Sequence, residues 1–124
     1  MRVFKNKSFE RFARKQHISD DDLLDAIERA EKGLIDADLG GGVIKQRIAR
    51  KGQGKSGGFR NIILFQSGDR AFFVYGFPKS ERENIDDDEE AAFKKMANKL
   101  LAMSEKSLAK ALAHGIFVEV LKND

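Results

Sequence analysis

The chain contains no cysteine and no tryptophan, and it has a single proline. The absence of cysteine excludes disulfides and thiolate metal sites, and it agrees with a cytoplasmic location. No run of about 18 apolar residues occurs, so we expect no membrane-spanning helix and no membrane partner. The first residues, MRVFKNKSFERF, are charged throughout and lack the apolar core of a signal peptide.

The composition that remains is typical of a globular protein. The chain has 124 residues, of which 41% are apolar and 35% are charged. This length fits a single domain with one modest core, and we expect that domain to span residues 1–124.

Charge is distributed unevenly along the chain, although the net charge is only +3. Residues 43–82 contain nine basic and two acidic residues, a net charge of +7, whereas residues 83–90 contain six acidic residues and no basic ones. A basic block of this kind indicates a polyanionic partner. It is equally typical of a sheet edge that lysines keep soluble, so charge alone leaves both interpretations open.

Helical patterns occur near both ends of the chain. A helix capped by Asn6 or Ser8 precedes a second one that Ser19 can cap, and together they predict a helical hairpin. Toward the C-terminus, the acidic run at 86–90 suits the start of a third helix, and Ser104 can cap a short fourth one.

Five segments have the alternating or apolar pattern of strands. They are residues 2–5, 43–50, 59–66, 70–77 and 116–121. The segment DLGGGV before the second of them is interpreted as a break without a strand. The predicted order is β-α-α-β-β-β-α-α-β, which is an α+β domain around an antiparallel sheet.

The glycine-rich segment GQGKSGGFR, residues 52–60, resembles a nucleotide-binding loop at first sight. That motif requires a glycine five positions before Gly54, where this chain has Ala49. The motif also joins a strand to a helix, whereas this segment is predicted to join two strands. A flexible connection, or a loop that follows a nucleic-acid backbone, remains as an interpretation.

The hairpin that follows is predicted to place a cation beside aromatic rings. If residues 67–68 form the turn, Arg60 lies opposite Tyr75; if residues 68–69 form it, Arg60 lies opposite Phe77. In either case these three residues share one face. Nearer the turn, the same face is expected to hold Ile62, Leu64 and Phe73.

More cations are predicted around the open end of this hairpin. They are Lys45 and Arg47 on the preceding strand, Lys51 and Lys55 in the loop, and Lys79 and Arg82 after Pro78. Cations with aromatic rings fit RNA, because arginine and lysine bind phosphates and rings stack on unpaired bases. The alternative is structural: Arg60 stacks on Tyr75, and the cations after Pro78 pair with neighbouring acidic residues.

Other candidate sites have weak signals. His17 and His114 are placed near helix C-termini, where a favourable interaction with the helix explains them better than a two-histidine ribonuclease would. The acidic runs lie at helix starts and lack the ligand spacing of a calcium loop, so no metal and no cofactor is expected.

Residues 54–85, GKSGGFRNIILFQSGDRAFFVYGFPKSERENI, resemble the RelE/ParE superfamily of bacterial toxins, closest to its HigB-type RelE-like branch. The matching features are SGGFR at a strand start, the GDRAFF hairpin and YGFPKSERENI before a helix; LGGGVIKQRIAR upstream is also similar. The resemblance implies the compact RelE-like fold, in which an N-terminal helical hairpin packs on an antiparallel-core sheet.

The resemblance also implies the toxin of a type II toxin–antitoxin system. RelE-like members are ribosome-dependent, metal-independent endoribonucleases that cut mRNA in the A site. The implied partners are a cognate antitoxin, often with a helix-turn-helix domain, the ribosome and mRNA. Two alternatives stay open: a gyrase-inhibiting toxin of the ParE kind, and a domain that binds RNA or the ribosome without cleavage.

The resemblance carries over to particular residues. Arg60, Lys79 and Arg82 are the implied catalytic residues: Arg60 would stabilise the transition-state phosphate, and the other two would hold phosphate or protonate the leaving group. Some relatives have a base-stacking tyrosine after this basic segment, where this chain reads ENIDDD, so Tyr75 or Phe77 would take over stacking. The predicted RNA-binding residues are Lys45, Arg47, Lys51, Lys55, Arg70, Tyr75 and Phe77.

Overall fold

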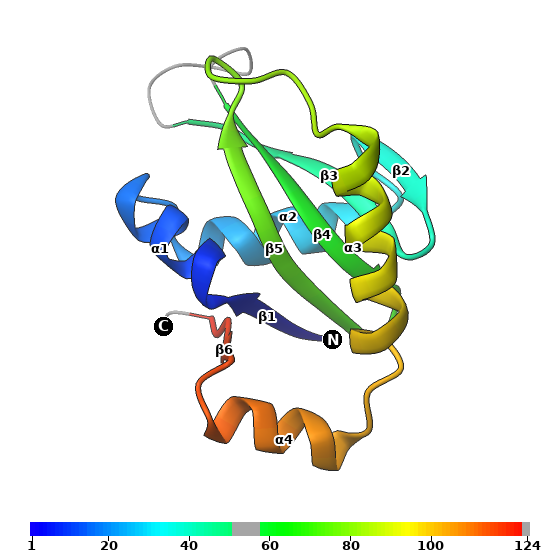
Figure 1. The fold of residues 1–124 in the computed structure, drawn as a ribbon. Helices are drawn as coiled ribbons and strands as arrows, with labels where there is room; N and C mark the ends of the chain where they lie inside the picture. Colours follow the sequence, from blue (N-terminus) through cyan, green and yellow to red (C-terminus); the bar gives the residue numbers. More distant parts are fainter. Residues whose placement is uncertain (51–57, 123–124) are drawn as a thin grey trace.

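A computed structural model describes residues 1–50 and 58–122 of the chain. The described residues form a six-stranded sheet in the order β2-β3-β4-β5-β1-β6, with helices on both faces (Figure 1). The strands are β1 (Arg2–Asn6), β2 (Ala37–Gly40), β3 (Val43–Ile48), β4 (Phe59–Gln66), β5 (Arg70–Pro78) and β6 (Phe117–Glu119). The helices are α1 (Lys7–Lys15), α2 (Asp20–Glu31), α3 (Asp87–Leu100) and α4 (Glu105–Ala113). The predicted α+β class is confirmed.

The sheet is antiparallel in its described part except for β1 and β5, which run parallel. The strand β5 lies between β4 and β1 and is buried along most of its length, which explains why its sequence is apolar on both faces. Its central place in the sheet therefore agrees with its apolar sequence.

Helix starts follow the capping residues of the sequence. The Asn6 side chain caps α1 by accepting a hydrogen bond from the Phe9 amide at 2.8 Å. Ser19 and Asp22 form a capping box at α2, and Asp86 and Glu89 form one at α3. His114 follows α4, where its Nδ1 lies 2.8 Å from the Lys110 carbonyl oxygen, so its expected place at a helix C-terminus is confirmed.

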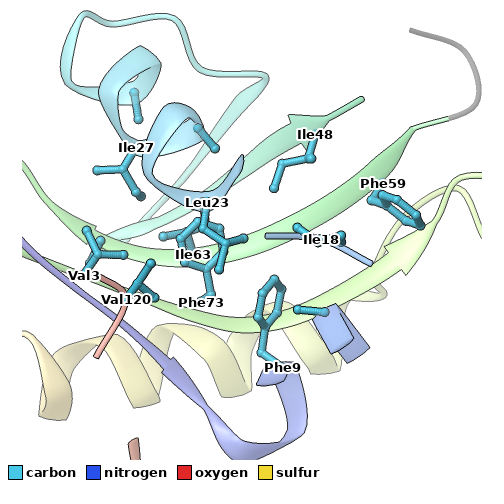
Figure 2. Packing of buried hydrophobic residues seen from close by; sticks show 14 of the residues in the cluster. Val3, Phe9, Ile18, Leu23, Ile27, Ile48, Phe59, Ile63, Phe73 and Val120 are labelled. Carbon is cyan, nitrogen blue, oxygen red and sulfur yellow. The ribbon is translucent and has the colours of Figure 1, made fainter. Parts of the chain in front are cut away.

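Each face of the sheet has its own hydrophobic core. On one face α1 and α2 cover a cluster that includes Phe9, Leu23 and Ile63 (Figure 2). On the other, α3 and α4 cover a cluster that includes Ile62 and Leu108. No helix among the described residues has the length and apolar character needed to cross a membrane.

The prediction that the segment DLGGGV before the strand at 43–50 contains no strand of its own is wrong. Residues 37–40 form β2, which pairs with β3 through a tight turn in which Gly40, Gly41 and Gly42 all have positive φ. The strand is short and has weak β-propensity, so its pattern did not stand out. Glycine is required at the turn, because a Cβ on Gly42 would lie 2.7 Å from the Leu101 side chain.

The predicted facing of Phe73 is also wrong. A three-residue turn separates Gln66 from Arg70, and a bulge at Val74 shifts the register, so that Ile62 lies opposite Tyr75 but Ile63 lies opposite Phe73. Phe73 therefore joins the α1–α2 core, away from Ile62. In an apolar strand no alternation marks the extra residue, which is why the sequence did not reveal it.

Candidate functional site

The predicted cations meet at the end of the sheet where β4 begins and β5 ends. Arg47 on β3, Arg60 on β4 and Phe77 on β5 lie opposite one another across the three strands. In the next row, Lys45 and Tyr75 flank Ile62. We call this surface, with Arg82 from the following loop, the basic face; α3 lies on the same side of the sheet (Figure 1).

Asp36, which directly precedes β2, holds the arginine pair of the basic face. Arg60 donates a hydrogen bond from Nη1 to Asp36 Oδ2, and Arg47 Nη2 lies 3.7 Å from Asp36 Oδ1. The exposed fractions of the side chains are 13% for Arg60, 21% for Asp36 and 36% for Arg47. Like charges on opposing positions repel, so a shared carboxylate stabilises this arrangement.

The segment that carries Asp36 is itself anchored by a buried glutamine. Gln46 donates from Nε2 to the carbonyl oxygens of Ala26 and Leu34, and its Oε1 accepts from the Asp36 amide at 3.3 Å. All functional groups of this buried side chain are thereby used, which fixes the backbone at Asp36 relative to α2.

Arg82 is bound on several sides. Its Nη1 donates to the Tyr75 hydroxyl at 3.0 Å, its two Nη atoms contact both carboxylate oxygens of Glu89, and its Nε donates to the Asn84 carbonyl. Its guanidinium also lies over the rings of Tyr75 and Phe77, 5.8 and 5.5 Å from their centroids. Arg82 therefore fastens the loop after β5 to α3 and to the sheet.

These contacts determine the protonation of the pair. The hydrogen bond to Glu89, followed by the one to Tyr75, raises the pKa of Arg82, and the hydrogen bond from Arg82 lowers the pKa of Glu89. A guanidinium held in this way does not give up a proton. Two roles were predicted for Arg82, proton donor and phosphate ligand. Because its guanidinium keeps its proton, only the role of phosphate ligand is compatible with this residue.

Tyr75 and Phe77 are placed as ring neighbours, with centroids 5.6 Å apart. Tyr75 also stacks on Phe93 of α3 at 6.1 Å and is half-buried, whereas Phe77 is only 3% exposed. A ring as buried as Phe77 has no face open to an RNA base. Its predicted stacking role has no support in this placement, and Tyr75 stays the candidate.

The remaining predicted residues lie in different places. Lys79 is exposed directly after β5, where its amide donates to the Gly58 carbonyl at 3.2 Å, and Lys45 is half-buried on the basic face. Lys51 and Lys55 lie outside the described residues.

Arg70 lies apart from the basic face, at the opposite end of β5. It is 6% exposed and donates from Nη1 to the Met103 carbonyl at 2.8 Å and from Nη2 to Glu105 at 3.1 Å. These bonds tie the connection between α3 and α4 to the sheet. The prediction that Arg70 binds RNA has no support in this position.

Of the two carboxylates of the site, Asp36 was missed from the sequence, and Glu89 was foreseen only as a member of the acidic run. Asp36 is 24 residues from Arg60 in the chain, and no local pattern connects them. Glu89 belongs to the acidic run that capping explained; it does cap α3, but it also binds Arg82. The structural alternative for Arg82, pairing with the acidic run after it, is confirmed, whereas the partner of Arg60 is Asp36, which was not predicted.

The surroundings of the site are open. An open cavity of about 620 Å³ borders Asp36 and Arg47 and extends toward Arg29 of α2. Within residues 1–50 and 58–122, no three or more His, Asp and Glu side chains are grouped as metal ligands.

Fold and site together define a small α+β domain whose sheet carries two opposed arginines, Arg47 and Arg60, at one end. Comparison with known families identifies that class more closely: residues 1–120 match the family described as the RelE toxin of the RelE/RelB toxin–antitoxin system. The chain therefore belongs to the RelE toxin family and is of the toxin type, which implies an antitoxin partner. No curated protein matches the chain.

Proposed function

We propose that this protein is a HigB-type member of the RelE family that cuts mRNA on the translating ribosome, with the basic face as its RNA site. The observation that carries the proposal is the convergence of Arg47, Arg60 and Arg82 on one surface of the sheet. Guanidiniums gathered on one face suit a phosphodiester backbone, because their planar donors match the geometry of phosphate oxygens.

The proposed reaction is transesterification without a metal ion. The ribose 2′-oxygen attacks the adjacent phosphorus, the bond to the 5′-oxygen breaks, and a cyclic phosphate forms; the 2′-hydroxyl loses a proton and the leaving oxygen gains one. Negative charge develops on the phosphate oxygens, and Arg60 is placed to stabilise it. Lys79 is the proposed proton donor, because of the three implied catalytic residues only its ammonium can exchange a proton.

Inhibition of gyrase and RNA binding without cleavage are the competing functions. The paired arginines favour RNA as the target. The described residues of the basic face also include no exposed large hydrophobic side chain, which a protein target would be expected to require. For the antitoxin we propose a helix-turn-helix protein with an acidic segment that covers the basic face.

Mapping of mRNA ends in bacteria that express the protein tests the proposal. Wild-type protein is expected to produce new ends within translated codons, and the triple variant Arg60→Ala, Lys79→Ala, Arg82→Ala is expected to produce none. Lys106→Ala on α4 is a matched control, since it removes an exposed lysine that forms no ion pair with a described residue. Growth arrest with DNA damage and without new ends would instead favour gyrase as the target.

A further inference from the structure

The Asp36 carboxylate spans two arginines in the way that a phosphate would. One of its oxygens is bound by Arg60 and the other is directed toward Arg47. A phosphodiester also has two non-bridging oxygens that share one negative charge, and arginine binds carboxylates and phosphates with the same donors. The carboxylate therefore marks a position where an anion with two acceptor oxygens fits.

The guanidinium of Arg47 has N–H donors at this position that are not used by the described residues. Its guanidinium forms no hydrogen bond with any described residue, because the 3.7 Å approach to Asp36 is an ion pair at longer range. Its Nε is buried and has no hydrogen-bond partner in residues 1–50 or 58–122. A buried donor without an acceptor costs stability, so an incoming oxygen would be favourable there.

We propose that Asp36 occupies the binding position of one RNA phosphate between Arg47 and Arg60, and that RNA displaces it when it binds. The inference rests on the proposed function in taking RNA as the ligand of the basic face. It adds a phosphate subsite formed by two named arginines and an internal anion that competes for it.

The surroundings of Asp36 allow the exchange without movement of the backbone. The Asp36 amide stays bonded to buried Gln46, so the displacement involves only its side chain. That side chain borders the open cavity of about 620 Å³, which Arg29 also lines. Rotation of the carboxylate into this open space would free the donors of both arginines.

Competition by an internal carboxylate should change how RNA binding depends on salt. In the wild type, Asp36 already neutralises part of the charge of the arginine pair, so fewer salt ions are released when RNA phosphate replaces it than would be released from two unpaired arginines. Without the carboxylate the site gains one net positive charge, so RNA binds more tightly. Its affinity also falls more steeply with salt, by a slope of about 0.7 for each additional neutralised charge on a single strand.

The test compares Asp36→Asn with Asp38→Asn in the full chain. Asp38 is two residues away, and its Oδ1 accepts from the Gly40 amide at 2.9 Å, a bond that asparagine can keep. Both variants remove one charge from nearly the same place, so long-range attraction is matched. The probe is a 2′-O-methylated single-stranded RNA, which cannot be cut, and its binding is followed by fluorescence anisotropy across a salt series.

We expect Asp36→Asn to bind this RNA roughly tenfold more tightly at low salt, with the steeper salt dependence, and Asp38→Asn to stay within about twofold of the wild type. Equal affinities for the two variants, or no binding by Asp36→Asn, would overturn the inference. Because this RNA cannot react, a failure here is distinct from a failure of mRNA cleavage, which end mapping detects.

A second pair of variants covers the case in which Asp36→Asn is unstable. Asp36→Glu keeps the charge and is expected to restore the wild-type salt dependence. Arg47→Gln is expected to weaken RNA binding several-fold more in the Asp36→Asn protein than in the wild type, where the carboxylate already neutralises Arg47. An equal effect of Arg47→Gln in both proteins would contradict the exchange.

Discussion

The two ends of β5 use arginine in different ways. At its start, Arg70 is buried and binds the Met103 carbonyl and Glu105, so its terminal nitrogens are committed to the fold. Beside its end, Arg47 on β3 and Arg60 on β4 share one carboxylate, and the Arg47 guanidinium forms no hydrogen bond with a described residue. The backbone carbonyl bound by Arg70 supports the fold, whereas the proposed exchange of Asp36 would let the Arg47–Arg60 pair take a ligand.

The largest effect that we expect is a loss of mRNA cleavage when Arg60 is replaced. Arg60→Ala should lower the rate of mRNA cleavage on purified ribosome complexes by about 100- to 1000-fold, because a donor to the developing phosphate charge is lost. The rate is measured from the appearance of cut mRNA in single turnover. A variant that cuts within a few-fold of the wild type would remove Arg60 from the reaction.

A smaller effect, on stability alone, is expected at the other end of the strand. Arg70→Ala should lower the free energy of unfolding by roughly 1–3 kcal/mol, because it leaves the Met103 carbonyl without this side-chain donor. Urea denaturation measures this change. At a temperature where the variant is folded, its affinity for RNA should equal that of the wild type; a large loss of affinity would show that Arg70 belongs to the RNA site.

Arg82 lies between these two cases, and its partner Glu89 gives the smallest effect. Glu89 has a lowered pKa in the folded state, so its ion pair stabilises the fold above about pH 4.5, the ordinary pKa of glutamate, and this contribution is lost as the pH falls through the lower folded value. Glu89→Gln should therefore melt slightly below the wild type at pH 7, and the two melting temperatures should converge in acid. A constant difference at every pH would mean that the charge of Glu89 is irrelevant.

Much of the fold could be predicted because its signals are local. Asn6, Ser19 and the acidic start of α3 cap helices through residues three positions away, and periodicity marks the longer strands. The strand β2 and the bulge at Val74 escaped prediction, because one is short and the other leaves no trace in an apolar run.

The basic residues of the site could be predicted from the sequence, but the carboxylate that pairs with Arg60 could not. Arg60 opposite an aromatic residue follows from the hairpin, and the structure confirms Phe77 as that residue. The pairing of Arg60 with Asp36, and of Arg70 with the α3–α4 connection, depends on segments 24 and more residues away. Such contacts depend on tertiary packing, which cannot be predicted from the charge distribution or the hydrophobic periodicity of the sequence.

The most direct test of the contrast between the two ends of β5 is mRNA end mapping with two charge-conserving variants, Arg60→Lys and Arg70→Lys. Lysine keeps the charge but not the several planar donors of arginine. We expect Arg60→Lys to abolish the new mRNA ends while the protein stays folded, and Arg70→Lys to produce the wild-type ends at any temperature where it is folded. Wild-type cutting by Arg60→Lys, with loss of cutting by folded Arg70→Lys, would contradict the assignment of the active site to the basic face.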